Sequence, residues 1–319
     1  MSRGAAALTI GLLFGAFLSA APIPKQISVQ VNAVTVPVTV TGARGDFVSG
    51  LKQANFRLLV DGVEHPVEYF SAEEEPAQVL VLVETGPAVY LLRREHISAA
   101  AKLVQGLGMG DRVAIAAYSD SPGLLLDFTT DHVEASAALQ TINYAMGNAQ
   151  LNFYDSLGSA LDWLASATGK RAVVLLTTGL DSSGHWQALA QKLQQTNVLV
   201  LPVALGGELR PDKAKASTHN SGETLSFAES DRALEAIATE TGGYAFFPRT
   251  ESDYQQAYLR IASLLRHQYS LGFSAAQQDG RYHTIGVEVI DDQGRNFSGK
   301  ERKPEYRVNA RRGFLAPGP

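Results

Sequence analysis

The stretch that decides the fold class of this chain is Val79-Leu80-Val81-Leu82-Val83-Glu84-Thr85-Gly86-Pro87-Ala88. Its first half is an unbroken apolar run, which predicts a strand buried on both faces, as in parallel sheets. The run ends in an acidic residue followed by small residues. Open α/β sheets bind their ligands at the carboxyl ends of the strands. We therefore expect the segment from Glu84 to Ala88 to lie at a functional site.

Segments of two kinds alternate after this run. Short apolar stretches predict further strands, and stretches with apolar residues every three or four positions predict helices that pack on the sheet. This alternation predicts a doubly wound, mostly parallel α/β sheet with right-handed crossovers. The predicted strands cover residues 113–118, 124–128, 172–176, 198–205 and 244–247, and one predicted helix covers 135–146. Residues 208–226 are polar and lack an apolar period, so we expect an exposed insertion there.

Strand patterns of another type occur near both ends of the chain. Residues 27–40 alternate apolar and polar side chains, as in a strand with one buried face. Residues 56–60 and 67–70, joined through the turn Asp61-Gly62, predict a hairpin. Residues 269–273 and 284–290 predict further strands. We expect the two ends to form one small antiparallel β module, in which Arg307, Arg311 and Arg312 are solvated charges that protect a sheet edge.

The domain limits follow from these changes of pattern. The acidic, polar joint around Glu73-Glu74-Glu75-Pro76 fits a domain boundary. We therefore expect an N-terminal β module at 22–75, an α/β domain at 76–267, and C-terminal strands at 268–319 that complete the β module.

The N-terminus has the features of a signal peptide. Arg3 precedes an apolar segment from Ala5 to Leu18, and Ser19-Ala20-Ala21 is a small-residue cleavage site. This pattern predicts removal of residues 1–21 and export to the periplasm or the cell exterior, with an uncleaved anchor as the alternative. The processed chain is then expected to have no integral membrane span. The sequence has no cysteine, which excludes a disulfide and a lipid-anchored cysteine.

Composition narrows the class of partner. Hydrophobic residues make up 45% of the chain and charged residues 18%, a balance that supports a packed core rather than disorder. The net charge is −5, and the sequence has no long basic run, so we expect no nucleic-acid partner.

The order of several short segments carries a family resemblance. The apolar strand 79–83 is one of them, and the others are Gly45-Asp46-Phe47-Val48-Ser49-Gly50-Leu51, Thr241-Gly242-Gly243, Gln268-Tyr269-Ser270-Leu271-Gly272-Phe273 and Arg311-Arg312-Gly313-Phe314. Together they resemble the von Willebrand factor type A family, in the bacterial branch described as von Willebrand factor A-related acidobacterial proteins. The resemblance implies an α/β domain with a divalent-cation adhesion site. In the family, an Asp-Xaa-Ser-Xaa-Ser motif, a threonine at a helix start and a further aspartate build that site.

This chain departs from that ligand pattern. Glu84 stands where the motif has its first aspartate, and Gly86 and Ala88 replace the two serines. Leu151 falls at the threonine position, and Thr178 falls at the second aspartate position. Mg²⁺ and Ca²⁺ need hard oxygen ligands, and one carboxylate is left. We therefore predict a degenerate site with no metal and no other cofactor, while a shifted Mg²⁺ or Ca²⁺ site built from Thr85, Asp155, Thr178 and Asp181 is the alternative.

The resulting functional hypothesis is an exported, non-catalytic module that binds a protein partner or takes part in envelope assembly without a metal. Its partner is an unidentified protein. The candidate contact residues come from the loops after the strands, and they are Glu84, Thr85, Asn152, Thr178, Asp181 and His185.

Two other functions stay open at the level of sequence. The first is metal-dependent adhesion through a rebuilt site. The second is an exported hydrolase, because Ser182, Ser183 and His185 cluster near Asp181 and His219 lies in the polar insertion. The sequence has no Gly-x-Ser-x-Gly elbow. We therefore expect Ser182 and Ser183 to cap the helix that begins near His185 rather than to act as nucleophiles.

Overall fold

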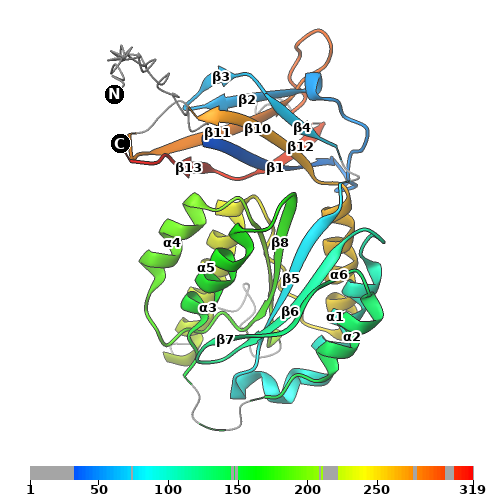
Figure 1. Cartoon of the computed structure of the whole chain (residues 1–319), viewed down its shortest axis with the longest axis vertical. Coiled ribbons are helices and arrows are strands. Elements are labelled where there is room, and N and C mark those ends of the chain that lie inside the picture. The colour runs from blue at the N-terminus through cyan, green and yellow to red at the C-terminus, as the bar shows by residue number, and fades with distance from the viewer. Residues whose placement is uncertain are drawn as a thin grey trace, which may run out of the picture. The chain divides into compact units, whose positions relative to one another are not determined.

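The centre of the fold is a five-stranded sheet with the strand order β7-β6-β5-β8-β9 (Figure 1). The computed structural model describes residues 32–72, 75–144, 147, 150–207, 210, 222–275, 279–298 and 305–318. Strands β5, β6, β8 and β9 are parallel, and β7 runs antiparallel to β6. The bounds are β5 (Ala77–Glu84), β6 (Arg112–Tyr118), β7 (Pro122–Thr129), β8 (Lys170–Thr177) and β9 (Leu199–Ala204). The predicted mostly parallel α/β sheet is confirmed.

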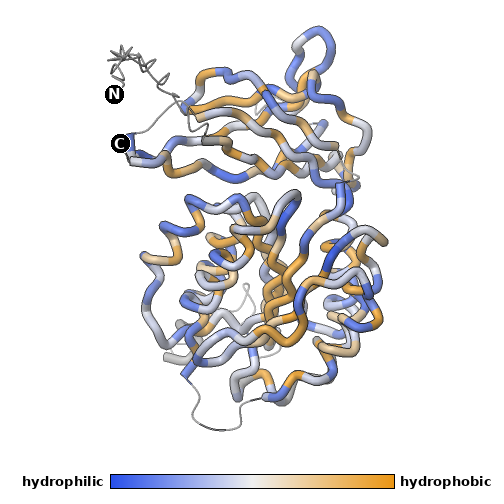
Figure 2. Tube along the Cα trace, viewed as in Figure 1, coloured by the Kyte–Doolittle hydropathy of each residue, from blue (hydrophilic) through white to orange (hydrophobic). Residues whose placement is uncertain are grey.

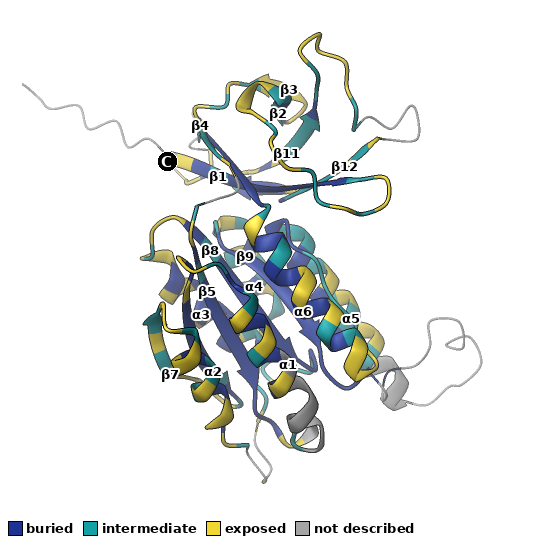
Figure 3. Ribbon diagram, turned by 90° about the vertical axis from the view of Figure 1, so that its right-hand side faces the viewer, coloured by how far each residue is buried: buried dark blue, intermediate teal, exposed yellow. Residues whose placement is uncertain are grey.

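Helices cover both faces of this sheet (Figure 3). One face packs on α1 (Arg93–Gly106), α2 (His132–Gln140) and α6 (Glu251–Arg266). The other face packs on α3 (Phe153–Ala165), α4 (Trp186–Gln195) and α5 (Gly222–Thr241). A short 3-10 helix, η2 (Pro87–Leu92), leads from β5 into α1.

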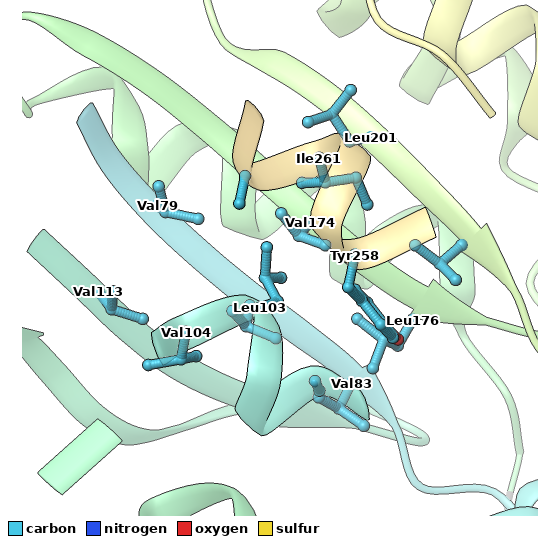
Figure 4. Packing of buried hydrophobic residues seen from close by; sticks show 14 of the residues in the cluster. Val79, Val83, Leu103, Val104, Val113, Val174, Leu176, Leu201, Tyr258 and Ile261 are labelled. Atoms are coloured by element: carbon cyan, nitrogen blue, oxygen red, sulfur yellow. The ribbon is translucent and has the colours of Figure 1, made fainter. Parts of the chain in front are cut away.

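The apolar run in β5 is buried because its residues alternate between the two helical layers. Val79, Val81 and Val83 face the layer that contains α1 and α6, where Figure 4 shows Val79 and Val83 near Leu103 and Tyr258. Leu80 and Leu82 face the opposite layer. Each of these side chains contributes about 1.5–3 kcal/mol when it is fully buried. Figure 2 shows the hydrophobic residues concentrated along the central strands.

Two four-stranded antiparallel sheets form the β module, and both contain strands from the two ends of the chain. The first has the order β12-β1-β10-β4, and the second has the order β13-β11-β2-β3. Their strands are β1 (Asn32–Gly42), β2 (Phe56–Val60), β3 (Val63–His65), β4 (Tyr69–Ser71), β10 (Tyr269–Ala275), β11 (Tyr282–Val289), β12 (Tyr306–Ala310) and β13 (Gly313–Leu315). The 3-10 helix η1 (Gln53–Asn55) precedes β2. The predicted pairing of the N-terminal and C-terminal segments is therefore correct, whereas the domain limits themselves stay predictions.

Several local predictions differ from the structure. The hairpin partner of β2 is β3, which follows the turn directly, and the segment predicted for that role forms β4 in the other sheet. Residues 244–247 form no strand, because Phe246 makes only a single bridge to Val203. Helix α2 ends at Gln140 instead of extending toward residue 146. Helix α5 begins at Gly222, inside the predicted insertion.

Hydrogen bonds from two buried cations, Arg311 and Lys170, help to hold together the compact unit Asn32–Pro319. Arg311, predicted as a solvated charge, is 2% exposed. Its guanidinium donates to the carbonyls of Gly313 and Gln194 at 2.7 and 2.8 Å and to Asn197 Oδ1 at 3.0 Å. Lys170 Nζ donates to the carbonyl of Gln268 at 2.7 Å. These bonds explain how both cations are buried, since a buried charge needs hydrogen-bonded partners.

Candidate functional site

The carboxyl ends of three central strands meet at the predicted site. Glu84 is the last residue of β5 and is in register with Tyr118, the last residue of β6. Thr177 ends β8 on the other side of β5. Because these strands are parallel, their last side chains lie at the same edge of the sheet. Glu84 is 0% exposed, so its carboxylate is inside the protein.

Four hydrogen-bond donors surround the Glu84 carboxylate. The hydroxyls of Tyr118 and Thr177 donate to Oε2 at 3.3 and 2.9 Å, and the backbone N–H of Thr178 donates to the same oxygen at 2.6 Å. The hydroxyl of Thr178 lies 2.9 Å from both carboxylate oxygens. The Tyr118 and Thr177 hydroxyl oxygens lie 2.7 Å apart, so the single Tyr118 proton is shared between Thr177 and, at the longer distance of 3.3 Å, Glu84. The carboxylate is thus held by hydroxyl and amide donors of the chain itself.

Burial changes the titration of this cluster. Desolvation raises the pKa of Glu84, and the donated hydrogen bonds of Thr178 and Thr177 act in the opposite direction. Burial, followed by the charge of Glu84, raises the pKa of Tyr118 well above its ordinary value. Tyr118 therefore stays a neutral donor at physiological pH.

An apolar side chain closes the site next to Gly86. A Cβ atom added to Gly86 would lie 3.3 Å from Leu151 Cδ1 and 3.7 Å from Glu84 Oε1. The methyl group of Leu151 therefore occupies the space into which a residue-86 side chain would extend. The side chain of Ala88 lies outside the described part of the chain.

A buried arginine near the cluster was missed by sequence reasoning. Arg210 is 6% exposed and donates to the carbonyls of Thr178 and Leu205. It also pairs with Asp231 and lies with its guanidinium 5.1 Å from the Phe227 ring. Burial lowers the pKa of Arg210 to about 10. Its position in a polar segment suggested a solvated side chain, and no local pattern signals that it folds back under Thr178.

Hydrogen bonds between three loops form the rim of the site. Asn152 donates from its backbone to the carbonyl of Ser119 and from Nδ2 to the carbonyl of Asp120, both at 2.8 Å. The backbone N–H of Ser182 donates to the carbonyl of Leu151 at 2.7 Å. The loop before α3 is therefore tied to the loops after β6 and β8.

Two carboxylates of the rim have partners of their own. Asp155 lies 2.9 Å from Nδ1 of His185, and both side chains are largely exposed. Asp181 accepts from the backbone N–H groups of Tyr154 and Gly184 at 3.0 and 2.7 Å. These contacts place Asp155, Asp181 and His185 on the outer surface of the rim.

The candidate contact residues fall into two groups. Glu84, Thr85 and Thr178 are buried, so in this conformation their side chains do not lie on the surface where a partner would dock. The Thr85 hydroxyl donates to the carbonyl of Tyr118 at 2.9 Å instead. Asn152, Asp181 and His185 lie at the rim, where a partner can reach them. The residues of the alternative metal site are likewise divided between interior and rim, and within the described ranges no three His, Asp or Glu side chains are placed to hold a metal ion.

Ser182 and Ser183 lie in the loop that follows β8, where both hydroxyls make hydrogen bonds. Ser183 donates its hydroxyl to Asp181 at 2.9 Å, and Ser182 Oγ accepts from the backbone of Leu151 at 3.3 Å. Helix α4 has His185 as its N-cap without a side-chain capping bond, so the prediction that Ser182 and Ser183 cap it is wrong. Ser183 Oγ does accept from the backbone N–H of the N-cap residue His185 at 3.3 Å, but it makes no bond to the first turn of the helix itself. His219 lies outside the described residues.

Comparison with known proteins identifies the family. Among solved structures, the chain is similar to an aerotolerance-related membrane protein from Bacteroides fragilis (17% identity, 59% of this chain and 98% of that chain, TM-score 0.47). It is also similar to a von Willebrand factor type A protein from Catenulispora acidiphila (11% identity, 89% and 73%, TM-score 0.46). No curated protein matches its sequence. No described helix has the length and apolarity that a membrane span requires. The sequence profile of the von Willebrand factor type A domain matches residues 93–259, about half of the chain, and the chain therefore belongs to this family.

Proposed function

We propose that this chain is an exported, non-catalytic protein-binding or envelope-assembly module whose type A domain works without a divalent cation. We also propose that it belongs to the acidobacterial branch described above, which the order of its terminal segments supports. The observation that carries the proposal is the buried carboxylate of Glu84, whose oxygens already accept hydrogen bonds from Tyr118, Thr177 and Thr178.

The chemistry of the surrounding groups supports a metal-free site. A hard cation needs several oxygen ligands at short distance. Glu84 is the one carboxylate among the positions that correspond to the family's ligands, and the Leu151 Cδ1 methyl group occupies the space next to Gly86, where the family has a serine. Arg210 places a positive charge near Glu84, where it stabilises the ionised carboxylate and disfavours a second cation.

The rim supports a role in protein binding. Asn152, Asp181 and His185 are presented on loops that hydrogen-bond to one another. A surface that is held in place before binding loses less conformational entropy when a partner docks. We propose these three residues as contacts and assign no catalytic group.

The direct test is calorimetric titration of Mg²⁺, Ca²⁺ and Mn²⁺ into the chelator-treated, purified chain. The matched variant is Glu84→Gln, which keeps the size of the side chain and removes its charge. A positive control combines Glu84→Asp, Gly86→Ser, Ala88→Ser, Leu151→Thr and Thr178→Asp, which restores the family's ligand types. We expect no binding heat for the native chain and for Glu84→Gln. Sub-millimolar binding to the native chain that Glu84→Gln abolishes would replace the proposal by metal-dependent adhesion.

A further inference from the structure

The outer edge of strand β7 presents an unpaired backbone next to apolar side chains. In the described part of the chain, β7 is the last strand of its sheet, and β6 is its neighbour on one side. The opposite sheet edge is partly covered, because Phe246 exchanges backbone hydrogen bonds of 2.8 Å with Ala204 and Pro202 of β9. Figure 3 shows much of β7 exposed. An open strand edge is a template for pairing with another chain.

Large apolar side chains accompany this edge. Leu124 and Leu125 of β7 are 50% and 44% exposed, and Trp163 of the neighbouring helix α3 is 37% exposed. The ladder with β6 shifts register between Ile115 and Ala116, where the pairing changes from Leu126 to Leu124. A shift of this kind adds an extra residue, Leu125, which is typical of a bulge that redirects a side chain.

A hollow lies between β7 and α3 and reaches the core. It has a volume of about 170 Å³. Its walls include Pro122, Leu124 and Trp163, and its floor includes the core residues Leu80 and Leu82. We call this feature the β7 groove. A cavity of about 150 Å³ lined by apolar side chains holds a benzene molecule, so the β7 groove has room for one leucine or phenylalanine side chain.

The acidic side chains around the β7 groove indicate which kind of partner it can bind. The chain has no lysine or arginine between Val113 and Gly169, the segment that forms β7, α2, α3 and most of β6. The same segment has six acidic residues, which are Asp120, Asp127, Asp131, Glu134, Asp155 and Asp162. Asp162 pairs with Lys192, and Arg112, which directly precedes the segment, donates to the carbonyl of Phe128 at 3.2 Å. Asp120 and Asp127 flank the hollow along the chain and are exposed. A second copy of this chain would bring two acidic edges together, which like-charge repulsion disfavours.

We propose that the β7 groove binds an extended segment of a basic protein partner, which adds a strand to β7 and places one leucine or phenylalanine in the hollow. The backbone ladder supplies affinity, and the alternate side chains supply selectivity. Lysine or arginine residues of the segment face Asp120 and Asp127. This inference rests on the proposed protein-binding function and names a surface and a partner chemistry that the rim residues do not provide.

The test uses the peptide acetyl-Lys-Thr-Val-Leu-Val-Thr-Lys-amide and the purified chain in the Trp186→Phe background, so that Trp163 is the one fluorophore of its type. Control peptides replace both lysines with glutamate or the central leucine with proline. The expected result is a change of Trp163 emission, together with amide NMR shifts along Gly123, Leu124 and Leu125. Both control peptides should bind at least about tenfold more weakly.

Two surface variants separate this groove from other sites. Leu124→Lys should weaken peptide binding by about tenfold or more, because one buried apolar contact is worth at least that factor. Leu259→Lys replaces a 63% exposed leucine on α6 and should leave binding unchanged.

Three results would overturn the inference. The first is the absence of any response at Trp163 and β7. The second is equal binding of the glutamate peptide. The third is sedimentation showing a dimer that Leu124→Lys dissolves, which would assign the groove to a second copy of the chain. Shifts confined to Asn152 and His185 would overturn the groove while retaining the proposed protein-binding function.

Discussion

Replacing Glu84 by glutamine tests how the buried site is stabilised. Three donors, from Tyr118, Thr177 and Thr178, point at Oε2, so an amide oxygen placed there keeps all three hydrogen bonds. The amide NH₂ then lies at the Oε1 position, where the Thr178 hydroxyl can accept from it. The substitution removes a buried charge without leaving a donor unpaired. We therefore expect Glu84→Gln to have a free energy of unfolding within about 1 kcal/mol of the native chain or above it.

Replacing Glu84 by alanine should have the opposite effect. The backbone N–H of Thr178 loses its acceptor inside the protein, the Tyr118 and Thr177 hydroxyls keep only their bond to each other, and a cavity remains. A buried donor without an acceptor costs about 1–3 kcal/mol, and a deleted buried partner typically costs about 3–5 kcal/mol in total. We expect Glu84→Ala to lower the free energy of unfolding by about 3–5 kcal/mol, as measured by urea denaturation at pH 7.

The stability of Glu84→Gln relative to the native chain should depend on pH. Burial raises the pKa of Glu84, so the native state binds a proton more tightly than the unfolded state does. The stability that comes from protonated Glu84 is full below the unfolded pKa and is lost as the pH rises through the raised pKa. Glu84→Gln should therefore gain stability relative to the native chain as the pH increases across that window. A loss of several kcal/mol in Glu84→Gln, equal to that in Glu84→Ala and reversed by added Mg²⁺, would refute this reasoning.

Other contacts give three further predictions. The carboxylates of Asp61 and Asp279 lie 2.7 and 3.1 Å from the ring nitrogens of His283 and raise its pKa, while their own pKa values are lowered. We therefore expect His283→Gln to destabilise the chain most between the lowered carboxylate pKa values and about pH 6. The difference in the free energy of unfolding should shrink as the pH rises through the His283 pKa, and urea denaturation across a pH series measures it. Gly86→Ser should cost about 1–3 kcal/mol because its Cβ approaches Leu151 Cδ1 at 3.3 Å, and a double-mutant cycle with Leu151→Thr should recover part of that loss; strictly additive values would contradict the close contact. Arg311→Met should lower the free energy of unfolding by about 2–4 kcal/mol because the carbonyl of Gln194 and Asn197 Oδ1 lose their donor, and an unchanged melting temperature would show that the buried guanidinium contributes nothing.

Local patterns of apolar and polar residues were sufficient to predict much of the fold. The unbroken run Val79–Val83 is buried on both faces, and the alternating residues 32–40 form a strand with one face in the core of the β module. These predictions succeeded because side-chain periodicity reflects how each element meets its neighbours. The prediction for 244–247 failed, because a short apolar stretch does not say whether the sheet continues beside it or a single bridge forms.

At the candidate site, too, the sequence predicted some features and did not predict others. The sequence identified Glu84, Gly86, Leu151 and Thr178 as positions that depart from a metal-binding pattern, and the structure brings all four together. It did not indicate that Glu84 and Thr178 are inaccessible to a partner. Burial depends on residues that are distant in the sequence, and here the Glu84 carboxylate is enclosed by Thr177 and Thr178, which follow it by 93 and 94 positions.

The sequence by itself determined the class of sheet, the order of its elements and the types of ligand atom at the end of β5, because these depend on residues that are neighbours along the chain. Only the tertiary structure decided where the charges of Arg210 and Arg311 reside. Arg210 donates to the carbonyl of Thr178, which is 32 positions away in the chain. Arg311 donates to the carbonyl of Gln194, which is 117 positions away. The neighbouring residues in the sequence predict that a charged side chain is exposed to solvent. Such a side chain can be buried only where backbone carbonyls from distant parts of the chain come together to accept its hydrogen bonds.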